Sequence, residues 1–183
     1  MIKAFNNLFN VIKRNKTEIY LSAVIFLGTM LLGFLISKLN SSIYNNKLSN
    51  TYIQGFNTIT IIENNLRAAL YLIIGNITLG LSTIIILVFN GFSDGIMLGI
   101  HSKNLAIDTI LVKTIFHGIF ELPAIIFCGG IGLKTLSICI RTLRGKQSEI
   151  KTQIKDSLIL FLLSFVLILI AGVIEGSIVP MLL

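Results

Sequence analysis

Three ionisable residues within apolar stretches are the strongest candidates for chemistry in this sequence. His117 and Glu121 lie one helical turn apart, and Glu175 interrupts the last apolar run. Lys113 precedes His117 by the same four-residue step, which places Lys113, His117 and Glu121 on one face of a helix. Ionisable side chains are costly in lipid and by default mark a functional site. We therefore predict a polar centre formed by His117, Glu121 and Glu175.

This polar centre has three interpretations. A divalent metal such as zinc, bound by His117, Glu121 and Glu175, would activate water in an intramembrane peptidase or peptide cyclase. The same groups could instead bind and release protons as a partner moves. In the third interpretation they form a structural polar network, because a His-x-x-x-Glu spacing is common on helices and lacks the glutamate base of His-Glu-x-x-His. Familiar catalytic motifs such as Gly-x-Ser-x-Gly are absent from the sequence, which favours a non-enzymatic membrane subunit.

The composition predicts an all-α protein embedded in a lipid bilayer. Of the 183 residues, 54% are hydrophobic and 13% are charged, whereas soluble domains contain about 25% charged residues. The runs 19–37, 68–93 and 157–174 carry no charge and are each long enough to cross the membrane as a helix. The net charge of +7 comes from residues at the ends of apolar runs, so it indicates lipid headgroups rather than nucleic acid as the partner.

The distribution of charge predicts a single transmembrane domain with its basic segments on one side. Residues 1–18 read as an amphipathic cytoplasmic segment, and residues 19–183 as one helical domain. Within that domain we expect an external loop at 38–65 and a basic cytoplasmic loop at 141–156. The positive-inside rule then predicts a multi-pass chain in the cytoplasmic membrane, with its N-terminus in the cytoplasm.

A helix break is expected near Pro123. Proline has no N–H, and the ring of Pro123 opposes the carbonyl group of Ile119. The region 105–140 is therefore predicted to form either two short helices or a re-entrant pair. With two crossings there, the polytopic bundle would cross the membrane about five times.

Glycines at four-residue spacing predict close helix packing. Gly91, Gly95 and Gly99 form one such series, while Gly172 and Gly176 bracket Glu175. Small residues at this spacing let two helix backbones approach each other in lipid. Nearby polar side chains are expected to bond or cap helices rather than to catalyse a reaction; they are Asn64, Asn90 and Asp94.

Several short elements together resemble the stage II sporulation protein M family of membrane proteins. The most specific is His117-Gly-Ile-Phe-Glu121-Leu-Pro123-Ala124. The other elements are Glu63-Asn64-Asn65, Asn90-Gly91, Gly132-Leu133 and Ile174-Glu175. The resemblance covers most of residues 63–180.

The resemblance implies a polytopic helical protein that works within a larger complex. The member that gives the family its name acts in engulfment during spore formation, with a peptidoglycan-cleaving partner and a third membrane protein. Relatives also occur in gene clusters for circular bacteriocins, where they mature or export the peptide. The compact chain favours this second type, with transporter proteins and a peptide substrate as partners. The resemblance assigns no chemistry to His117 or Glu121.

Overall fold

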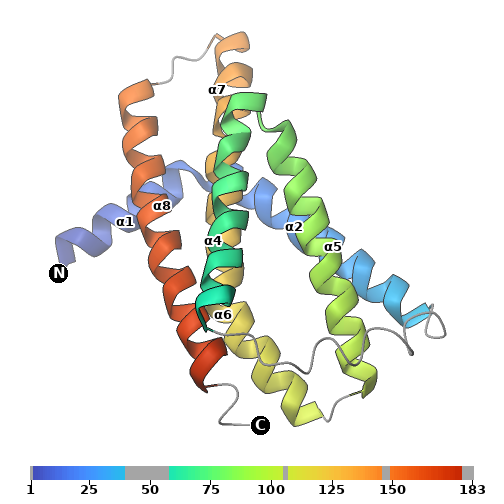
Figure 1. The fold of residues 1–183 in the computed structure, drawn as a ribbon. Helices are drawn as coiled ribbons and strands as arrows, with labels where there is room; N and C mark the ends of the chain where they lie inside the picture. Colours follow the sequence, from blue (N-terminus) through green and yellow to red (C-terminus); the bar gives the residue numbers. More distant parts are fainter. Residues whose placement is uncertain (1, 40–57, 105–106, 146–148, 179–183) are drawn as a thin grey trace.

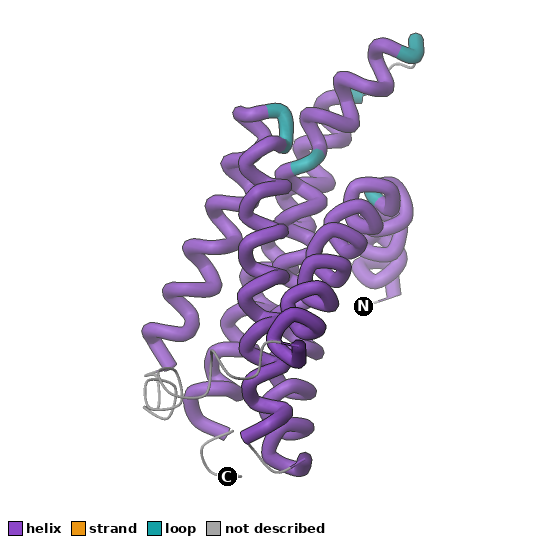
Figure 2. The backbone as a smooth tube through the Cα atoms, turned by 90° about the vertical axis from the view of Figure 1, so that its right-hand side faces the viewer, coloured by secondary structure: helices purple, strands orange, loops and turns teal. Residues whose placement is uncertain are grey.

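The computed structural model describes residues 2–39, 58–104, 107–145 and 149–178, and these residues fold almost entirely into helices. The longer helices are α1 (Ile2–Arg14), α2 (Lys16–Leu39), α4 (Thr58–Ile74), α5 (Leu81–Asn104), α6 (Ile107–Gly132), α7 (Lys134–Leu143) and α8 (Ile150–Val173) (Figure 1). A 3₁₀ turn, η1 (Gly75–Thr78), follows α4, and a short π-helix, η2 (Ile174–Ile178), follows α8. The described residues outside helices form only short turns (Figure 2). The predicted all-α helical bundle is confirmed.

Three of the described helices are long and apolar enough to cross a membrane. They are Lys16–Leu39, Leu81–Ser102 and the α8–η2 segment Ile150–Gly176. A bent pair, Gly118–Gly132 with Lys134–Leu143, makes a fourth candidate if it counts as one span. Large apolar side chains such as Leu31, which is 58% exposed, cover the outside of these helices. An apolar outer surface of this kind is what contact with lipid tails requires.

The run 68–93 forms a helical hairpin, so its prediction as one span was wrong. Helix α4 ends at Ile74, and the chain reverses at Leu79 and Gly80, whose φ angles are +54° and +85°. Glycine reaches this left-handed region at little cost. Thr83 donates a buried hydrogen bond of 2.8 Å to the carbonyl oxygen of Leu72 and so closes the hairpin. Hydropathy does not reveal such a turn, because the turn residues are uncharged.

The helix break expected near Pro123 lies ten residues further on. Helix α6 continues through Pro123 and ends at Gly132, and α7 leaves at an angle of 41°. A proline inside a membrane helix is tolerated where neighbouring helices and local adjustment accommodate the freed carbonyl group. The break is instead held by the hairpin, because Asn76 Oδ1 accepts hydrogen bonds from the N–H (3.2 Å) and the hydroxyl group (3.0 Å) of Thr135. Asn76 thus caps the first turn of α7.

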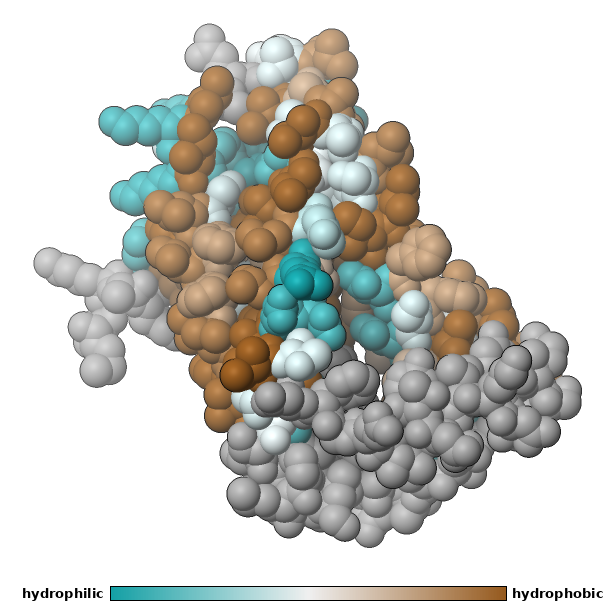
Figure 3. All heavy atoms as spheres, in the orientation of Figure 1, coloured by the Kyte–Doolittle hydropathy of each residue, from teal (hydrophilic) through white to brown (hydrophobic). Residues whose placement is uncertain are grey.

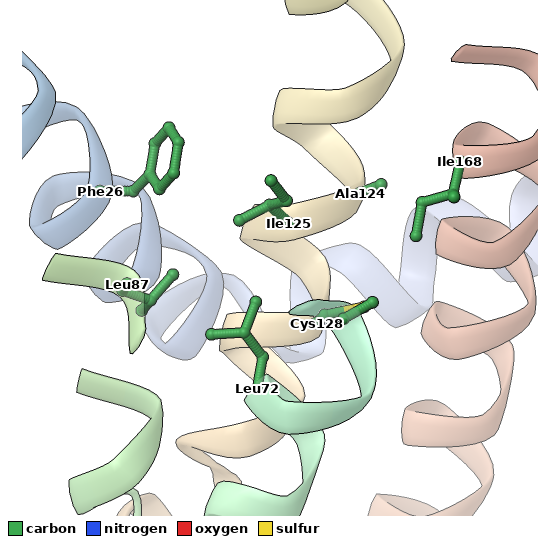
Figure 4. Packing of buried hydrophobic residues seen from close by; sticks show 8 residues of the cluster. Phe26, Leu72, Leu87, Ala124, Ile125, Cys128 and Ile168 are labelled. Atoms are coloured by element: carbon green, nitrogen blue, oxygen red, sulfur yellow. The ribbon is translucent and has the colours of Figure 1, made fainter. Parts of the chain in front are cut away.

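Helix α6 is the centre of the bundle. It contacts α2, α4, α5 and α8, and its buried residues join side chains from all four of these helices. Figure 4 shows Ala124 and Cys128 directed towards α8, while Ile125 points towards α2 and α5. The labelled members of this core are Phe26, Leu72, Leu87, Ala124, Ile125, Cys128 and Ile168.

Helices α2 and α5 meet at their glycines. A methyl group on Gly91 or Gly95 would overlap the carbonyl oxygen of Phe26 or Met30, respectively. Gly99 lies in the same way against Ser37, and Gly33 of α2 against the backbone of Phe92. The absence of side chains at these positions brings the two backbones into direct contact, which maximises van der Waals packing between helices in lipid.

We expect Gly95→Ala to destabilise the protein by about 1–3 kcal/mol, the usual cost of overpacking. The added methyl group would force α2 and α5 apart at Met30. Gly28→Ala is the matched control, because nothing lies within 4 Å of a Cβ atom at Gly28 of α2. The measurement is unfolding of the purified protein in detergent micelles; equal stability of the two variants would contradict the close contact.

Candidate functional site

Glu121 is buried in the centre of the bundle. Its side chain is 5% exposed, and it shares a face of α6 with Ala124 and Cys128, both fully buried. Cys128 lies beside Ser164 of α8, and Ala124 faces Ile168 (Figure 4). A carboxyl group in this position is enclosed by helices rather than exposed to lipid.

The antiparallel course of α6 and α8 brings Glu121 close in depth to Glu175. Ala124 of α6 faces Ile168 of α8. One helical turn further along each helix, Glu121 lies level with Ala171. One further turn sets the backbone of residue 117 level with Glu175. Helix α6 also contacts η2, the π-helix that carries Glu175. Short π-helical segments within helices are frequent at functional sites.

The predicted metal site is only partly described by the structure. The side chains of Lys113 and His117 lie outside the described residues, although their backbone belongs to α6. Among the described residues, no three His, Cys, Asp or Glu side chains form a group suited to a metal ion. A site at His117, Glu121 and Glu175 therefore stays a prediction.

The glycines beside Glu175 pack against α4. A Cβ atom on Gly172 would overlap the side chain of Ile62, and one on Gly176 would overlap Thr58. The end of α8 is thereby fixed against the start of α4, with Glu175 half-buried at this contact. These glycines set the position of Glu175 relative to both α4 and α6.

Two asparagines lie at the same depth on α4 and α5. Leu72 of α4 and Thr83 of α5 face each other across the hairpin. Asn65 lies seven residues further from the turn on α4, and Asn90 lies seven residues further from it on α5. The Nδ2 atoms of Asn65 and Asn90 are both buried, and neither has a hydrogen-bond partner among the described residues. Asp94 follows Asn90 by one turn, close in depth to Glu121. The polar residues of α4, α5, α6 and η2 thus occupy neighbouring layers, which we call the polar belt: Asn65, Asn90, Asp94, Glu121 and Glu175.

The outer side of α4 adds charged groups at this depth. Arg67 donates to Glu63 at 2.5 Å, and their side chains are 63% and 54% exposed. Asn64 is also exposed. Figure 3 shows hydrophilic side chains gathered in the middle of this face, over α4 and in a hollow beside it towards α5. We call Glu63, Asn64 and Arg67 the α4 polar face.

A second polar cluster, absent from our expectations, ties α1, α2, α7 and α8 together. Asp156 is 1% exposed and accepts hydrogen bonds from Arg14 (2.6 and 2.9 Å) and from Asn15 (3.1 Å). The hydrogen bond with Asp156 raises the pKa of Arg14, against a smaller opposing effect of burial. Glu18 is 3% exposed and accepts from Ser137 and from Arg141 (2.9 Å).

Lys134 completes this cluster. Its ammonium group donates to the carbonyl oxygen of Gln153 (2.9 Å) and to the hydroxyl group of Ser157 (3.0 Å). From the sequence, Glu18 and Asp156 were interpreted only as charges of basic surface segments. Lys134 could have indicated this cluster, because it is a lone cation after an apolar stretch and a buried cation needs a nearby partner.

Comparison with known proteins supports the resemblance found in the sequence. The sequence model of stage II sporulation protein M matches residues 22–180. The chain belongs to the stage II sporulation protein M family. An uncharacterized protein of the archaeon Methanocaldococcus jannaschii is 37% identical over 170 residues, which is 90% of this chain and 95% of that protein. A second uncharacterized protein of this organism is 28% identical over 180 residues, covering 91% of this chain and 83% of its own length.

No solved structure matches the chain. The stage II sporulation protein M match includes the whole polar belt and the α4 polar face. It also includes Lys134 and Asp156 but begins after Arg14 and Glu18. The segment before the family region therefore supplies the hydrogen-bond partners of Asp156, Ser137 and Arg141, whereas Lys134 binds groups within the region.

We expect Asp156→Asn to weaken the attachment of α1 to α8. The free energy of unfolding should fall by about 2–3 kcal/mol. This is less than the loss for a fully buried ion pair, because Arg14 is 46% exposed. Hydrogen exchange along α1 and unfolding in micelles measure the effect. Lys155→Gln, at the exposed neighbouring position, is the control and should leave hydrogen exchange and unfolding unchanged. Unaltered exchange along α1 in the Asp156 variant would contradict a role for the Arg14–Asp156 pair in holding α1.

Proposed function

We propose that this protein is a membrane-embedded subunit of a multiprotein complex, and that the α4 polar face binds a partner protein within the bilayer. The observation that carries the proposal is the exposed Glu63–Arg67 ion pair on a bundle whose outer surface is mainly apolar. Counting along the hairpin from Leu72 and Thr83 places Glu63 level with Phe92, in the middle of the α5 span. The ion pair therefore lies far from both ends of that helix.

The energetic argument rests on the cost of charge in hydrocarbon. A charged side chain at the centre of a membrane helix costs about 2.5–3.5 kcal/mol on insertion scales. Pairing Glu63 with Arg67 reduces this cost but leaves most of both side chains exposed. A protein partner that donates and accepts hydrogen bonds on this face would cover it. Helix α4, with 17 residues, is also shorter than the other bundle helices around it, which gives a partner access to the hollow towards α5.

The polar belt lies directly behind the α4 polar face. Asn65 follows Asn64 on the same helix, and its buried amide nitrogen lies at the depth of the amide of Asn90. A partner segment that enters between α4 and α5 would reach both amides. This arrangement supports a binding role for the face more strongly than a catalytic one.

Within that role, we propose that the complex matures or exports a circular bacteriocin, with a transporter and the peptide as partners. The helices from α4 to α8 are joined by short connections, which leave no long loop that could contact a cell-wall enzyme outside the membrane. These connections support this choice over the engulfment and cell-wall remodelling role. We also propose a cytoplasmic N-terminus in a bacterial membrane. The basic residues of α7 and of the start of α8 support this orientation because they lie at the upper end of the bundle in Figure 1, and Arg14 at the end of α1 pairs with Asp156 near the start of α8.

A photo-crosslinking amino acid at position 64 should capture a partner protein in native membranes. Val166 of α8 provides the matched control, because it is 50% exposed and its place in the α6–α8 register puts it near the same depth. We expect a discrete protein adduct from position 64 and only lipid adducts from position 166. Equal adducts from both positions, or a protein that purifies alone and is active alone, would contradict the proposal.

The bacteriocin assignment has its own test. If a precursor gene and a transporter gene lie beside this one, deleting this gene alone should leave the peptide linear or retained in the cell. Mass spectrometry of cells and medium measures both outcomes. Normal circular peptide in the medium of the deletion strain would reject the assignment while leaving the membrane-subunit role intact.

The alternative of an intramembrane metal-dependent peptidase or cyclase predicts a different result. Purified protein would carry stoichiometric metal, and Glu121→Gln would lose it because one of the three expected ligands is gone. Elemental analysis of both proteins is the measurement. Under the subunit proposal we expect no such difference, with the crosslink from position 64 preserved in the Glu121 variant.

A further inference from the structure

A hollow of about 580 Å³ lies between the start of α2 and the bend from α6 to α7. Its apolar lining comes from Leu21, Leu133, Leu136 and Ile140. Glu18, Arg141 and Arg144 supply its charged lining. The volume is within the range of small-molecule sites, which is about 300–1,000 Å³.

Glu18 lines this hollow and carries a hydrogen-bond acceptor without a donor among the described residues. One carboxylate oxygen, Oε1, accepts from Ser137 and Arg141. The other oxygen, Oε2, is buried and has no partner among the described residues, and the residue is 3% exposed. A buried carboxylate oxygen without a donor is unfavourable, because its lost hydration is not replaced. A ligand that carries an N–H or O–H group would supply the missing hydrogen bond to Oε2.

Arg144 brings a cation to the same hollow. It follows the last residue of α7, is exposed, and makes no ion pair among the described residues. Arg141 is already paired with Glu18, so the cation of Arg144 remains for an anionic ligand. Guanidinium groups bind phosphate oxygens through two parallel hydrogen bonds.

We propose that this hollow binds a phosphate-bearing membrane lipid whose headgroup carries an ammonium or hydroxyl donor. The phosphate binds Arg144, the donor binds Oε2 of Glu18, and the start of an acyl chain packs on Leu21 and Ile140. The site lies at the start of the apolar span Lys16–Leu39, where lipid headgroups meet the protein. Its apolar wall distinguishes a lipid from a soluble phosphate compound. This inference does not depend on the proposed partner at α4.

Native mass spectrometry of the full-length protein, stripped of lipid in detergent, tests the site with three probes. Phosphatidylethanolamine offers both phosphate and an ammonium donor, phosphatidylcholine offers the phosphate without an N–H donor, and glycerophosphoethanolamine lacks the acyl chains. We expect phosphatidylethanolamine to bind about tenfold more tightly than phosphatidylcholine, the usual effect of one hydrogen bond to a charged group. Glycerophosphoethanolamine should not compete.

Two variants separate the site from general attraction to charge. Arg144→Gln should weaken binding of both lipids about tenfold by removing the phosphate partner. Lys151→Gln removes the same charge from an exposed position of α8 outside the hollow, and should leave binding unchanged. Equal loss in the two variants, equal affinity for the two lipids, or effective competition by glycerophosphoethanolamine would each overturn the proposal.

Discussion

The turn between α4 and α5 is the constraint on which most of this architecture depends. It divides one long uncharged run into two antiparallel helices, closed by the bond from Thr83 to the Leu72 carbonyl group. The same turn packs on Gly132, where any side chain would overlap Leu72 and Thr83. It also supplies Asn76, which caps α7. One connection therefore sets the length of α4, the course of α5 and the place where the central helix ends.

The short α4 has a direct consequence for polar groups in the membrane. Because the hairpin turns early, Glu63 and Arg67 lie beside the middle of α5 rather than near either of its ends. The inner side of the same helix brings Asn65 to the depth of Asn90, close to the layer of Glu121 and Glu175. Hydrocarbon does not solvate such groups. The concentration of these groups on and behind α4 is the physical basis of the proposed partner-binding role.

The second polar cluster works differently because its members satisfy one another. Asp156 binds Arg14 and Asn15, while Lys134 binds backbone and hydroxyl oxygens of α8. Replacing Asp156 would leave Asn15 and the partly exposed Arg14 without their acceptor, which is destabilising. The cluster joins the N-terminal helix to the end of the bundle opposite the polar belt. Among the described residues of this cluster, Oε2 of Glu18 has no hydrogen-bond partner, and Glu18 lines the same hollow as Arg144.

The sequence by itself determined the class of protein, the spans that begin near residues 19 and 157, and the glycine series at 91, 95 and 99. Hydropathy and four-residue spacing are local properties, and a helix in lipid must satisfy its backbone within itself. The family also followed from short local elements. Tertiary structure alone decided that the run 68–93 is a hairpin, that the helix passes through Pro123 and bends at Leu133, and which charges are buried. Those outcomes depend on contacts between residues far apart in the chain, such as Asn76 with Thr135 and Arg14 with Asp156. The pattern of residues along one helix carries no information about which distant side chain will face that helix.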